Sequence, residues 1–286
     1  MDPHPLISVI TPVYNGEKFI GKCIQKVQQQ SFRHFEHIIV DGASADSTVT
    51  IVKKYTGDFE NVILHSEKDN GIYDAMNKGI SLAKGEWLFF LGCDDYFFED
   101  DVLEKVAAFI AANQQSQLIY GNVWYQKLAR LYDGAFDIEK ILKRNICHQS
   151  IFYHKGVFEI TGSYNLLYKI EADYEFNLRC WLSGKIRHSF IPLTIAFFAD
   201  GGFSAAARDA NMVANYPEII VQQIEKGSWA FGKKINLLSK AYRKIWMREG
   251  LKKMLATGFK MRVSGIHFIA LLWMFVTLPY YIIKRA

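Results

Sequence analysis

Two adjacent carboxylates, Asp94 and Asp95, follow the apolar run 87–91 (WLFFL) after two intervening residues. Placing two carboxylates together at the end of a buried strand is costly unless a cation or a set of hydrogen-bond donors receives them. Mg²⁺ and Mn²⁺ prefer such oxygen ligands, and Mg²⁺ commonly takes one or two carboxylates together with substrate phosphates. The pair therefore predicts a divalent-cation site for a phosphorylated ligand. The alternative is a surface turn ahead of a helix.

A second polar segment, 40–48 (VDGASADST), resembles a phosphate-binding loop only loosely. It contains neither G-x-G-x-x-G nor the lysine of a P-loop, which argues against a dinucleotide-dependent oxidoreductase and a P-loop NTPase. Asp41 suits a contact to a base or a ribose, whereas Asp46 or Ser47 is expected to cap the following helix. The segment thus adds a candidate nucleoside contact.

Strands and helices alternate through the first 120 residues, and this alternation positions the polar segments. Four apolar runs rich in β-forming residues are typical of strands, and apolar residues recur at helical spacing between them. The pattern predicts an α/β layer with a mostly parallel sheet, whose ligands sit beyond the carboxyl ends of the strands. The expected strands are 6–13, 35–41, 62–66 and 87–91, with carboxyl ends at 11–15, 41–46, 67–71 and 92–96.

The alternation weakens between residues 121 and 204. Short aromatic segments there predict further strands, and one helix is expected near 173–183. We expect this half to complete the site without forming an independent domain. The segment 200–204 (DGGFS) is typical of a mobile loop that could close over a ligand.

Four segments taken together resemble glycosyltransferase family two: SVITPVYN (8–15), VDGASADST (40–48), SEKDNGIYDAMNKGISLAKGEW (66–87) and FLGCDD (90–95). The resemblance covers roughly residues 6–204 and implies the GT-A fold and an inverting, nucleotide-sugar-dependent enzyme. It implies that Asp95 ligands a Mn²⁺ or Mg²⁺ ion on the donor diphosphate. The nucleoside contacts that it implies, usually to uridine, are Thr11, Tyr14, Asp41 and Asp94. Around the diphosphate or donor sugar it places Asp69, Asp74 and Asn77, with Asp69 favoured because Asp74 could equally be a first-turn helix acid.

The sequence departs from the commoner family pattern at two positions. Gly42 follows Asp41 where many relatives have a second acid, and Gly92 replaces the first acid of D-x-D-D. The departures predict a metal site with fewer protein ligands than usual.

The resemblance also implies a general base, an acid at the start of a helix in the second half, and Glu171–Glu175 (EADYE) is the matching segment. We assign the base to Asp173, which would accept the acceptor hydroxyl proton as that hydroxyl attacks the anomeric carbon. Helix capping is the alternative for Asp173, and Glu171 is the next candidate. His148 could approach the donor sugar or the diphosphate, or could be structural. Arg179 could face the acceptor or solvent.

Charge is divided unevenly along the chain. Residues 1–225 carry 21 Lys+Arg against 28 Asp+Glu, whereas residues 226–286 carry 13 against one. Basic residues mixed with aromatics at helical spacing suit a helix on an anionic membrane surface, and the apolar segment 266–283 is close to the minimum length for a span. The alternatives are a helix packed on the catalytic domain and an oligomer interface.

Composition excludes several other classes of protein. Half of the residues are hydrophobic and 22% are charged, which is unlike a disordered chain, a coiled coil or a collagen-like repeat. The four cysteines lack metal-site spacing and are expected to be free thiols, and the N-terminus lacks the features of a signal peptide.

These observations predict a GT-A catalytic domain at 1–225, with a nucleotide-binding half at about 1–120 and an acceptor half at about 121–225. A membrane-associating region at 226–286 follows. The expected enzyme is a hexosyl- or N-acetylhexosaminyltransferase on the cytoplasmic face of the cell membrane. It would move a sugar, with inversion, from a UDP-sugar to a lipid-linked or glycan hydroxyl in polysaccharide biosynthesis. The alternatives are a non-catalytic nucleotide-sugar-binding scaffold and a nucleotidyltransferase, and no nucleic-acid partner is expected.

Overall fold

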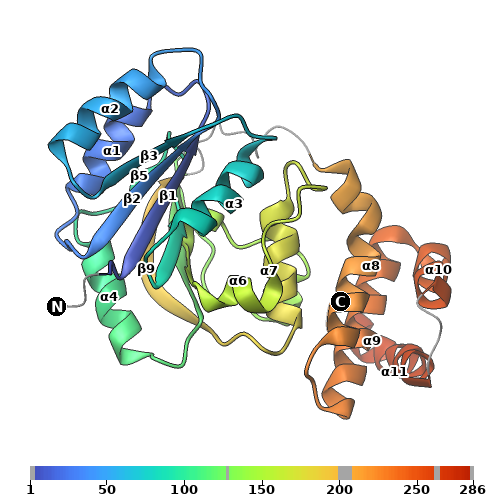
Figure 1. The fold of residues 1–286 in the computed structure, drawn as a ribbon. Helices are drawn as coiled ribbons and strands as arrows, with labels where there is room; N and C mark the ends of the chain where they lie inside the picture. The colour runs from blue at the N-terminus through green and yellow to red at the C-terminus, as the bar shows by residue number, and fades with distance from the viewer. Residues whose placement is uncertain (1–3, 127–128, 199–207, 261–264, 284–286) are drawn as a thin grey trace.

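A mixed sheet runs through the centre of the protein (Figure 1). The computed structural model describes residues 4–126, 129–198, 208–260 and 265–283. Strands within the described residues pair in the order β3-β2-β1-β4-β8-β6-β9-β5, with β7 on β6. All four cysteines are free thiols, as expected.

The first half alternates strands and helices as predicted. β1 and β2 are buried along their whole length, as expected of parallel strands covered on both faces, and β1, β2, β3 and β4 pair in parallel. The elements are β1 (Ile7–Val13), α1 (Ile20–Gln28), β2 (Phe35–Asp41), α2 (Thr48–Asp58), β3 (Val62–Ser66), α3 (Ile72–Leu82), β4 (Trp87–Phe90), β5 (Tyr96–Phe97) and α4 (Val102–Ala112).

The second half makes the sheet mixed, which corrects the expectation of a mostly parallel one. β8 is antiparallel to both β4 and β6, and β9 runs parallel to β6 but antiparallel to β5. Its elements are β6 (Leu118–Tyr125), β7 (Arg130–Tyr132), α5 (Ile138–Ile141), the 3₁₀ turn His148–Ser150, β8 (Ile151–His154), α6 (Gly156–Thr161), α7 (Ala172–Leu182) and β9 (His188–Phe198).

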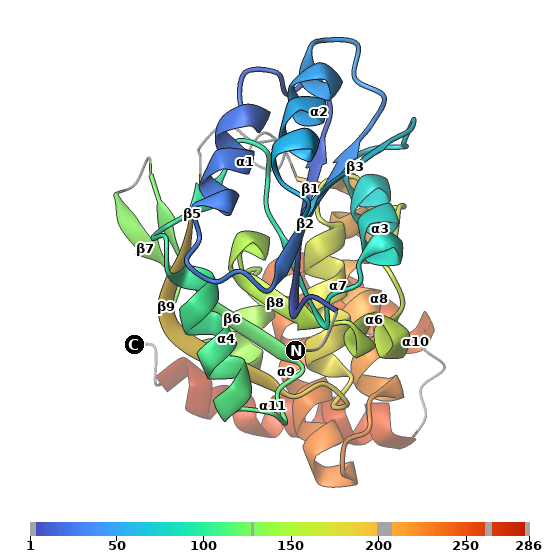
Figure 2. The same cartoon turned by 60° about the vertical axis from the view of Figure 1, so that its left-hand side comes forward.

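Helices cover both faces of the sheet. Helices α1, α2 and α4 bury apolar side chains on one face, and α3, α6 and α7 bury theirs on the other (Figures 1 and 2). Because α3 and α7 lie on the same face, residues at their N-terminal ends can meet although they are about a hundred positions apart in the chain. That face carries the candidate site.

In the part of the chain that the structure describes, four helices follow the sheet and lie side by side at one end of the molecule (Figure 1). They are α8 (Ala210–Lys226), α9 (Phe231–Glu249), α10 (Leu251–Lys260) and α11 (Gly265–Ile283). Buried residues of α8 and α9, including Tyr216, Leu238 and Tyr242, belong to the same apolar cluster as α7. Within the described part of the chain, no helix combines the length and the apolarity needed to cross a bilayer.

Candidate functional site

Asp41 ends β2 beside Val13, the last residue of β1. The Asp41 side chain is buried, and its Oδ2 atom accepts hydrogen bonds from the Ser66 hydroxyl at 2.7 Å and the Ser44 amide at 3.1 Å. Two donors therefore hold this carboxylate in one orientation at the edge of the sheet where ligands of α/β proteins bind. The structure places Asp41 at the carboxyl end of β2, as the sequence predicted.

Two residues predicted to contact the nucleoside, Thr11 of β1 and Tyr14 just after it, lie in different surroundings. The Thr11 hydroxyl is fully buried and lies 2.9 Å from Nε2 of His37, so this side chain belongs to the core. Tyr14, in the loop after β1, is 65% exposed and open to a ligand. Only Tyr14 of this pair presents its side chain at the surface.

Asp69 lies just before α3, Asp74 in its first turn and Asn77 in its middle, and the three make different contacts. A Cβ atom on Gly42 would lie 2.5 Å from Oδ2 of Asp69, which places this carboxylate directly over the loop that begins at Asp41. Asp74 accepts a hydrogen bond from the Asn70 amide at 2.9 Å and thus serves its own helix terminus.

Both ends of the Asn77 amide bind the backbone of Tyr164, at 2.9 and 3.0 Å. Asn77 therefore joins α3 to the loop that contains Tyr164. Of these three predicted site residues, the structure brings only Asp69 to the Asp41 loop.

Asp94 and Asp95 converge above Gly92. A Cβ atom on Gly92 would lie 2.6 Å from Oδ2 of Asp95 and 3.1 Å from Oδ1 of Asp94, so the absent side chain makes room for both carboxylates. The buried Asp95 also accepts a hydrogen bond from Nε2 of Gln149 at 2.7 Å. Among the described residues no cluster of three or more His, Cys, Asp or Glu side chains is arranged to hold a metal ion.

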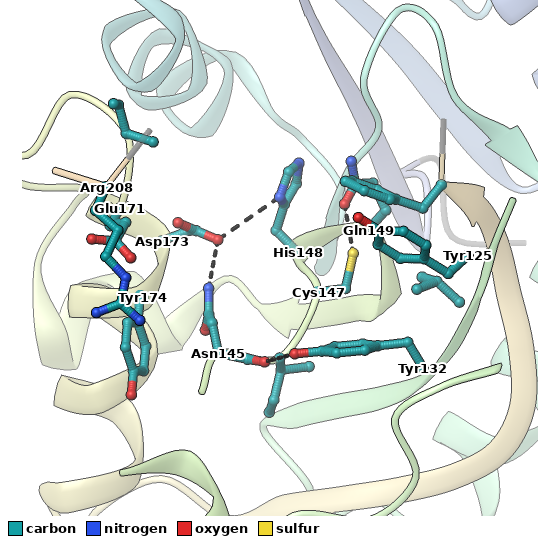
Figure 3. Close-up of a pocket in the computed structure, with 14 residues that line it drawn as sticks. Tyr125, Tyr132, Asn145, Cys147, His148, Gln149, Glu171, Asp173, Tyr174 and Arg208 are labelled. Carbon is teal, nitrogen blue, oxygen red and sulfur yellow. Dashed lines mark hydrogen bonds and ion pairs between the residues drawn. The ribbon is translucent and has the colours of Figure 1, made fainter. Parts of the chain in front are cut away.

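Asp173 lies in the first turn of α7 and is only 8% exposed. Its Oδ1 atom accepts a hydrogen bond from the Tyr73 hydroxyl at 2.8 Å, and its Oδ2 atom accepts one from the Asn145 amide at 2.7 Å. The Nδ1 atom of His148 lies 3.8 Å from Oδ2 (Figure 3). The structure thus brings the two predicted residues Asp173 and His148 together.

A cavity of about 580 Å³ opens beside Asp173. This volume is typical of sites that bind small molecules. Aromatic and polar side chains face each other across it, with Tyr125 and Tyr132 opposite Glu171, Asp173 and Tyr174 (Figure 3). The other residues that line it are Val123, Asn145, Ile146, Cys147, His148, Gln149, Ile170, Phe198 and Arg208.

Burial controls the protonation of the groups near Asp173. It lowers the pKa of His148, a shift that the nearby charges of Asp173 and Asp94 only partly oppose, so the imidazole is neutral at neutral pH. Burial raises the pKa of Tyr73, and the charge of Asp173 raises it further. Burial also raises the pKa of Glu171. Tyr73 therefore remains a hydrogen-bond donor to Asp173.

Other predicted positions have structural tasks or lie outside the described residues. Arg179 forms an ion pair with Glu175 at 2.9 Å and donates a hydrogen bond to the carbonyl of Ser163 at 2.7 Å, so its guanidinium group is engaged in contacts within the protein. Ser47 is the N-cap residue of α2, and Asp46 accepts the Thr48 amide. The segment 200–204 lies outside the described residues.

Sequence reasoning missed Tyr73, Asn145 and Arg208, whereas Gln149 belongs to the segment around His148 that was expected to approach the donor. Tyr73 belongs to a segment that carries the family resemblance, and Asn145 lies three residues before His148, so the signal for these two was proximity to noted residues. Nothing in the sequence marked Arg208.

A model of the family described as "Glycosyl transferase family 2" matches residues 8–162 of this chain. The PGL/p-HBAD biosynthesis glycosyltransferase of Mycobacterium tuberculosis is 39% identical over 216 residues, covering 74% of this chain and 84% of the relative. Chondroitin synthase of Escherichia coli is 25% identical over 190 residues, covering 64% of this chain and 28% of that protein.

Two solved transferases share the fold. Residues 1–349 of TarS from S. aureus, in complex with UDP-GlcNAc, superpose with a TM-score of 0.69 at 20% identity, covering 90% of this chain and 76% of that one. The mannosyltransferase PcManGT of Pyrobaculum calidifontis, in complex with GDP-Man and Mn²⁺, gives a TM-score of 0.60 at 16% identity, covering 99% and 84%. These similarities show a GT-A-like α/β fold.

Proposed function

The chain belongs to glycosyl transferase family 2, and from this premise we propose that it transfers a sugar from a UDP-sugar to an acceptor hydroxyl with inversion at the anomeric carbon. The observation that carries the proposal is the position of Asp173. The Asp173 carboxylate accepts hydrogen bonds from Tyr73 and Asn145 and lies in the wall of a cavity. The Asp41 and Asp94 loops of the same protein supply the other carboxylates of the site. UDP is favoured because TarS, which shares the fold, was solved with UDP-GlcNAc.

The donor side of the site is assigned to the loops after β1, β2 and β4. The exposed ring of Tyr14 and the fixed carboxylate of Asp41 suit contacts to the base and ribose. Asp94 lies at the next strand end, and Asp69, directly over Gly42, is placed between these loops and the donor phosphates or sugar.

The residues around Gly92 fit a divalent cation. Two carboxylate oxygens approach the same point above Gly92, and hard cations prefer oxygen ligands that they share with phosphates. Asp95 would hold Mn²⁺ or Mg²⁺ with help from Asp94. When bound, the ion would neutralise charge on the departing diphosphate. Gln149 fixes the orientation of the Asp95 carboxylate through its amide.

Asp173 would act as the general base. Tyr73 and Asn145 hold its two oxygens, and the carboxylate faces the cavity where an acceptor hydroxyl can enter. As the acceptor oxygen forms its bond to the anomeric carbon, its proton passes to Asp173 and the bond to the diphosphate breaks. One in-line displacement of this kind inverts the anomeric centre.

The cavity supports an acceptor that combines apolar and polar groups. Tyr125, Tyr132 and Phe198 offer flat apolar surfaces, whereas Glu171 and Arg208 offer hydrogen-bonding charges. A sugar ring of a glycan, or a lipid-linked acceptor, meets both requirements, and we propose this class of acceptor.

We also propose that the C-terminal helices bind the cytoplasmic surface of the cell membrane. Phe268, Leu272 and Phe275 of α11 are exposed, and so are Leu251 and Leu255 of α10. The whole segment 226–286 carries 13 basic residues against Glu249. Exposed apolar side chains with surrounding positive charge suit shallow insertion into anionic lipid.

Isothermal titration calorimetry tests the donor assignment. The purified protein should bind UDP-sugars in the presence of Mn²⁺, and Asp95→Ala should weaken that binding at least about tenfold because a charged ligand group is lost. Equal donor affinity for Asp95→Ala and the wild type would contradict the assignment of Asp95.

A further inference from the structure

A chain of hydrogen bonds leads from the core to the Asp173 carboxylate. The Tyr153 hydroxyl of β8 donates to Oδ1 of Asn177 at 2.8 Å, and Nδ2 of Asn177 donates to Oδ1 of Asn145 at 2.8 Å. The Nδ2 atom of Asn145 then donates to Oδ2 of Asp173 at 2.7 Å. Asn177 lies one helical turn after Asp173 on α7, and both Asn177 and Tyr153 are completely buried.

The donor and the acceptor in each hydrogen bond of the chain follow from the last bond, which ends on the Asp173 carboxylate. A carboxylate only accepts hydrogen bonds, so Asn145 must turn its NH₂ group toward Asp173 and its carbonyl oxygen toward Asn177. Asn177 must then donate to Asn145 and accept from Tyr153. Burial raises the pKa of Tyr153 well above its ordinary value, so its hydroxyl keeps the proton that it donates. All three donors therefore point toward Asp173.

Burying this chain of polar side chains costs more free energy than filling the same space with apolar side chains. A buried amide costs free energy unless its polar atoms are paired, and an apolar side chain would fill the position of Asn177 without that requirement. Hydrogen bonds that share one direction polarise each other and strengthen the last acceptor contact. The backbone carbonyl of Asn145 is itself held by the Tyr132 hydroxyl at 2.8 Å, which fixes the position of the final donor.

We propose that Tyr153, Asn177 and Asn145 are positioning residues, which act as a one-way donor chain to hold the Asp173 carboxylate for proton transfer. This inference rests on the proposed function of Asp173 as the base. The chain orients Oδ2, while Tyr73 donates to the other oxygen, Oδ1.

Tyr73 adds a contact that can change during the reaction. Its single hydroxyl proton has two acceptors within reach, Oδ1 of Asp173 at 2.8 Å and the carbonyl of Ile170 at 2.6 Å. When Asp173 has taken the acceptor proton, the Tyr73 hydroxyl can turn to Ile170. Within the described residues, Asp173 Oδ2 is the one acceptor that the structure shows for the Asn145 NH₂ group, so this contact keeps Asp173 in place throughout.

The variant Tyr153→Phe tests the chain at its far end, because it keeps the aromatic ring and removes the hydroxyl that donates to Asn177 and that also pairs with the Tyr164 hydroxyl. Tyr216→Phe is the matched control, since Tyr216 is equally buried and its hydroxyl pairs with the carbonyl of Leu142 and with the Tyr174 hydroxyl instead of with a member of the chain. We expect Tyr153→Phe to lower kcat about tenfold with the donor KM unchanged, through loss of alignment at Asp173. Tyr216→Phe should keep kcat within about twofold.

A stability measurement decides the question independently of activity. Tyr153 and Asp173 are not hydrogen-bonded to each other directly. If the chain does not connect them, the Tm loss of the double variant should equal the sum of the losses of Tyr153→Phe and Asp173→Asn. We expect the double variant to depart from the sum by at least about 2 °C, whereas Tyr216→Phe with Asp173→Asn should be additive. Additivity in both pairs would overturn the chain, even if the enzyme transferred sugar. Absence of transfer with non-additive Tm losses would instead contradict the proposed function alone.

Discussion

At the scale of single residues, the site depends on glycines that make room for carboxylates. Gly92 lets Asp94 and Asp95 converge, and Gly42 lets Asp69 lie over the Asp41 loop. Both glycines stand where the commoner family pattern has an acid. The departures that predicted a metal site with fewer ligands therefore have a steric reason, because a side chain at Gly92 would occupy the space of the Asp95 carboxylate.

Replacing Gly92 should therefore damage donor binding more than stability. In Gly92→Ala the new methyl group would displace the Asp95 carboxylate, and we expect UDP-sugar affinity with Mn²⁺ to fall at least about tenfold. Gly57→Ala is the control, because a Cβ atom there meets nothing within 4 Å and alanine favours its helix. Calorimetry on both variants checks this, and unchanged affinity in Gly92→Ala would refute the steric argument.

At the scale of elements, the sequence predicted the strands and helices of the first half and the short strands and helix α7 of the second half, but not how the strands of the second half pair. The four parallel strands and their helices have a local signature, since buried strands are continuously apolar and amphipathic helices show a stripe. The antiparallel β8 is four residues long, and its neighbours β4 and β6 are distant in the chain, so its pairing has no local signal. The same limit hid Tyr73 and Asn145, whose importance depends on which helix lies opposite.

Helix α11 is apolar along its length, but tertiary contacts bury one side of it and leave the other side exposed. His267, Ala270 and Met274 are buried against the protein, whereas Phe268 and Leu272 are exposed. His267 also lies 2.8 Å from the Tyr242 hydroxyl of α9. The spacing of buried and exposed positions predicts a helix that lies along a surface, because one side of it already has a protein partner.

The exposed side of α11 should mediate lipid binding. The wild type should co-sediment with vesicles that contain phosphatidylglycerol and less with pure phosphatidylcholine vesicles. The double variant Phe268→Ser, Leu272→Ser should bind about tenfold more weakly because two apolar side chains no longer enter the lipid. Phe59→Ser is the control, because Phe59 is an exposed residue directly after α2, a helix that lies across the molecule from α11 (Figure 1). Equal binding by all three proteins would refute this docking face.

At the scale of the whole molecule, the acidic and basic parts share one core. Leu238, Tyr242 and Ile245 of α9 are fully buried in the apolar cluster that contains α7, although they belong to the basic segment 226–286. Trp229 also donates a hydrogen bond to the carbonyl of Leu182 at 2.7 Å. The charge distribution in the sequence placed a boundary at residue 225, but α8 continues through that position to Lys226.

Truncation at residue 225 should therefore destabilise the catalytic part. Loss of α9 would expose apolar side chains of α8 and α7 to water, and we expect Tm to fall by more than about 10 °C or the protein to become insoluble. A chain that ends at residue 260 keeps α9 and should lose less. Differential scanning fluorimetry compares the three proteins, and an unchanged Tm after truncation at 225 would contradict a shared core.

Buried neutral histidines should make the fold sensitive to acid. Burial lowers the pKa of His37 from 6.5 to about 3, so below pH 6.5 the unfolded chain gains a proton that the folded protein excludes. Stability should fall as pH drops from 6.5 toward 3, by up to about 1.4 kcal/mol per pH unit from this residue. In His37→Phe the free energy of unfolding should depend less steeply on pH. Parallel denaturant titrations that gave equal slopes would contradict this.

Turnover with a panel of UDP-sugars tests the central claim most directly. With Mn²⁺ and lipid or glycan acceptors, the wild type should release UDP and form product of inverted anomeric configuration with at least one donor. Asp173→Asn should lose about 10²–10⁴-fold in kcat, the range expected for a general base. Glu171→Gln, at the same cavity, should lose less than about tenfold. Silence of the folded wild type across the panel, or equal kcat for Asp173→Asn, would contradict the account.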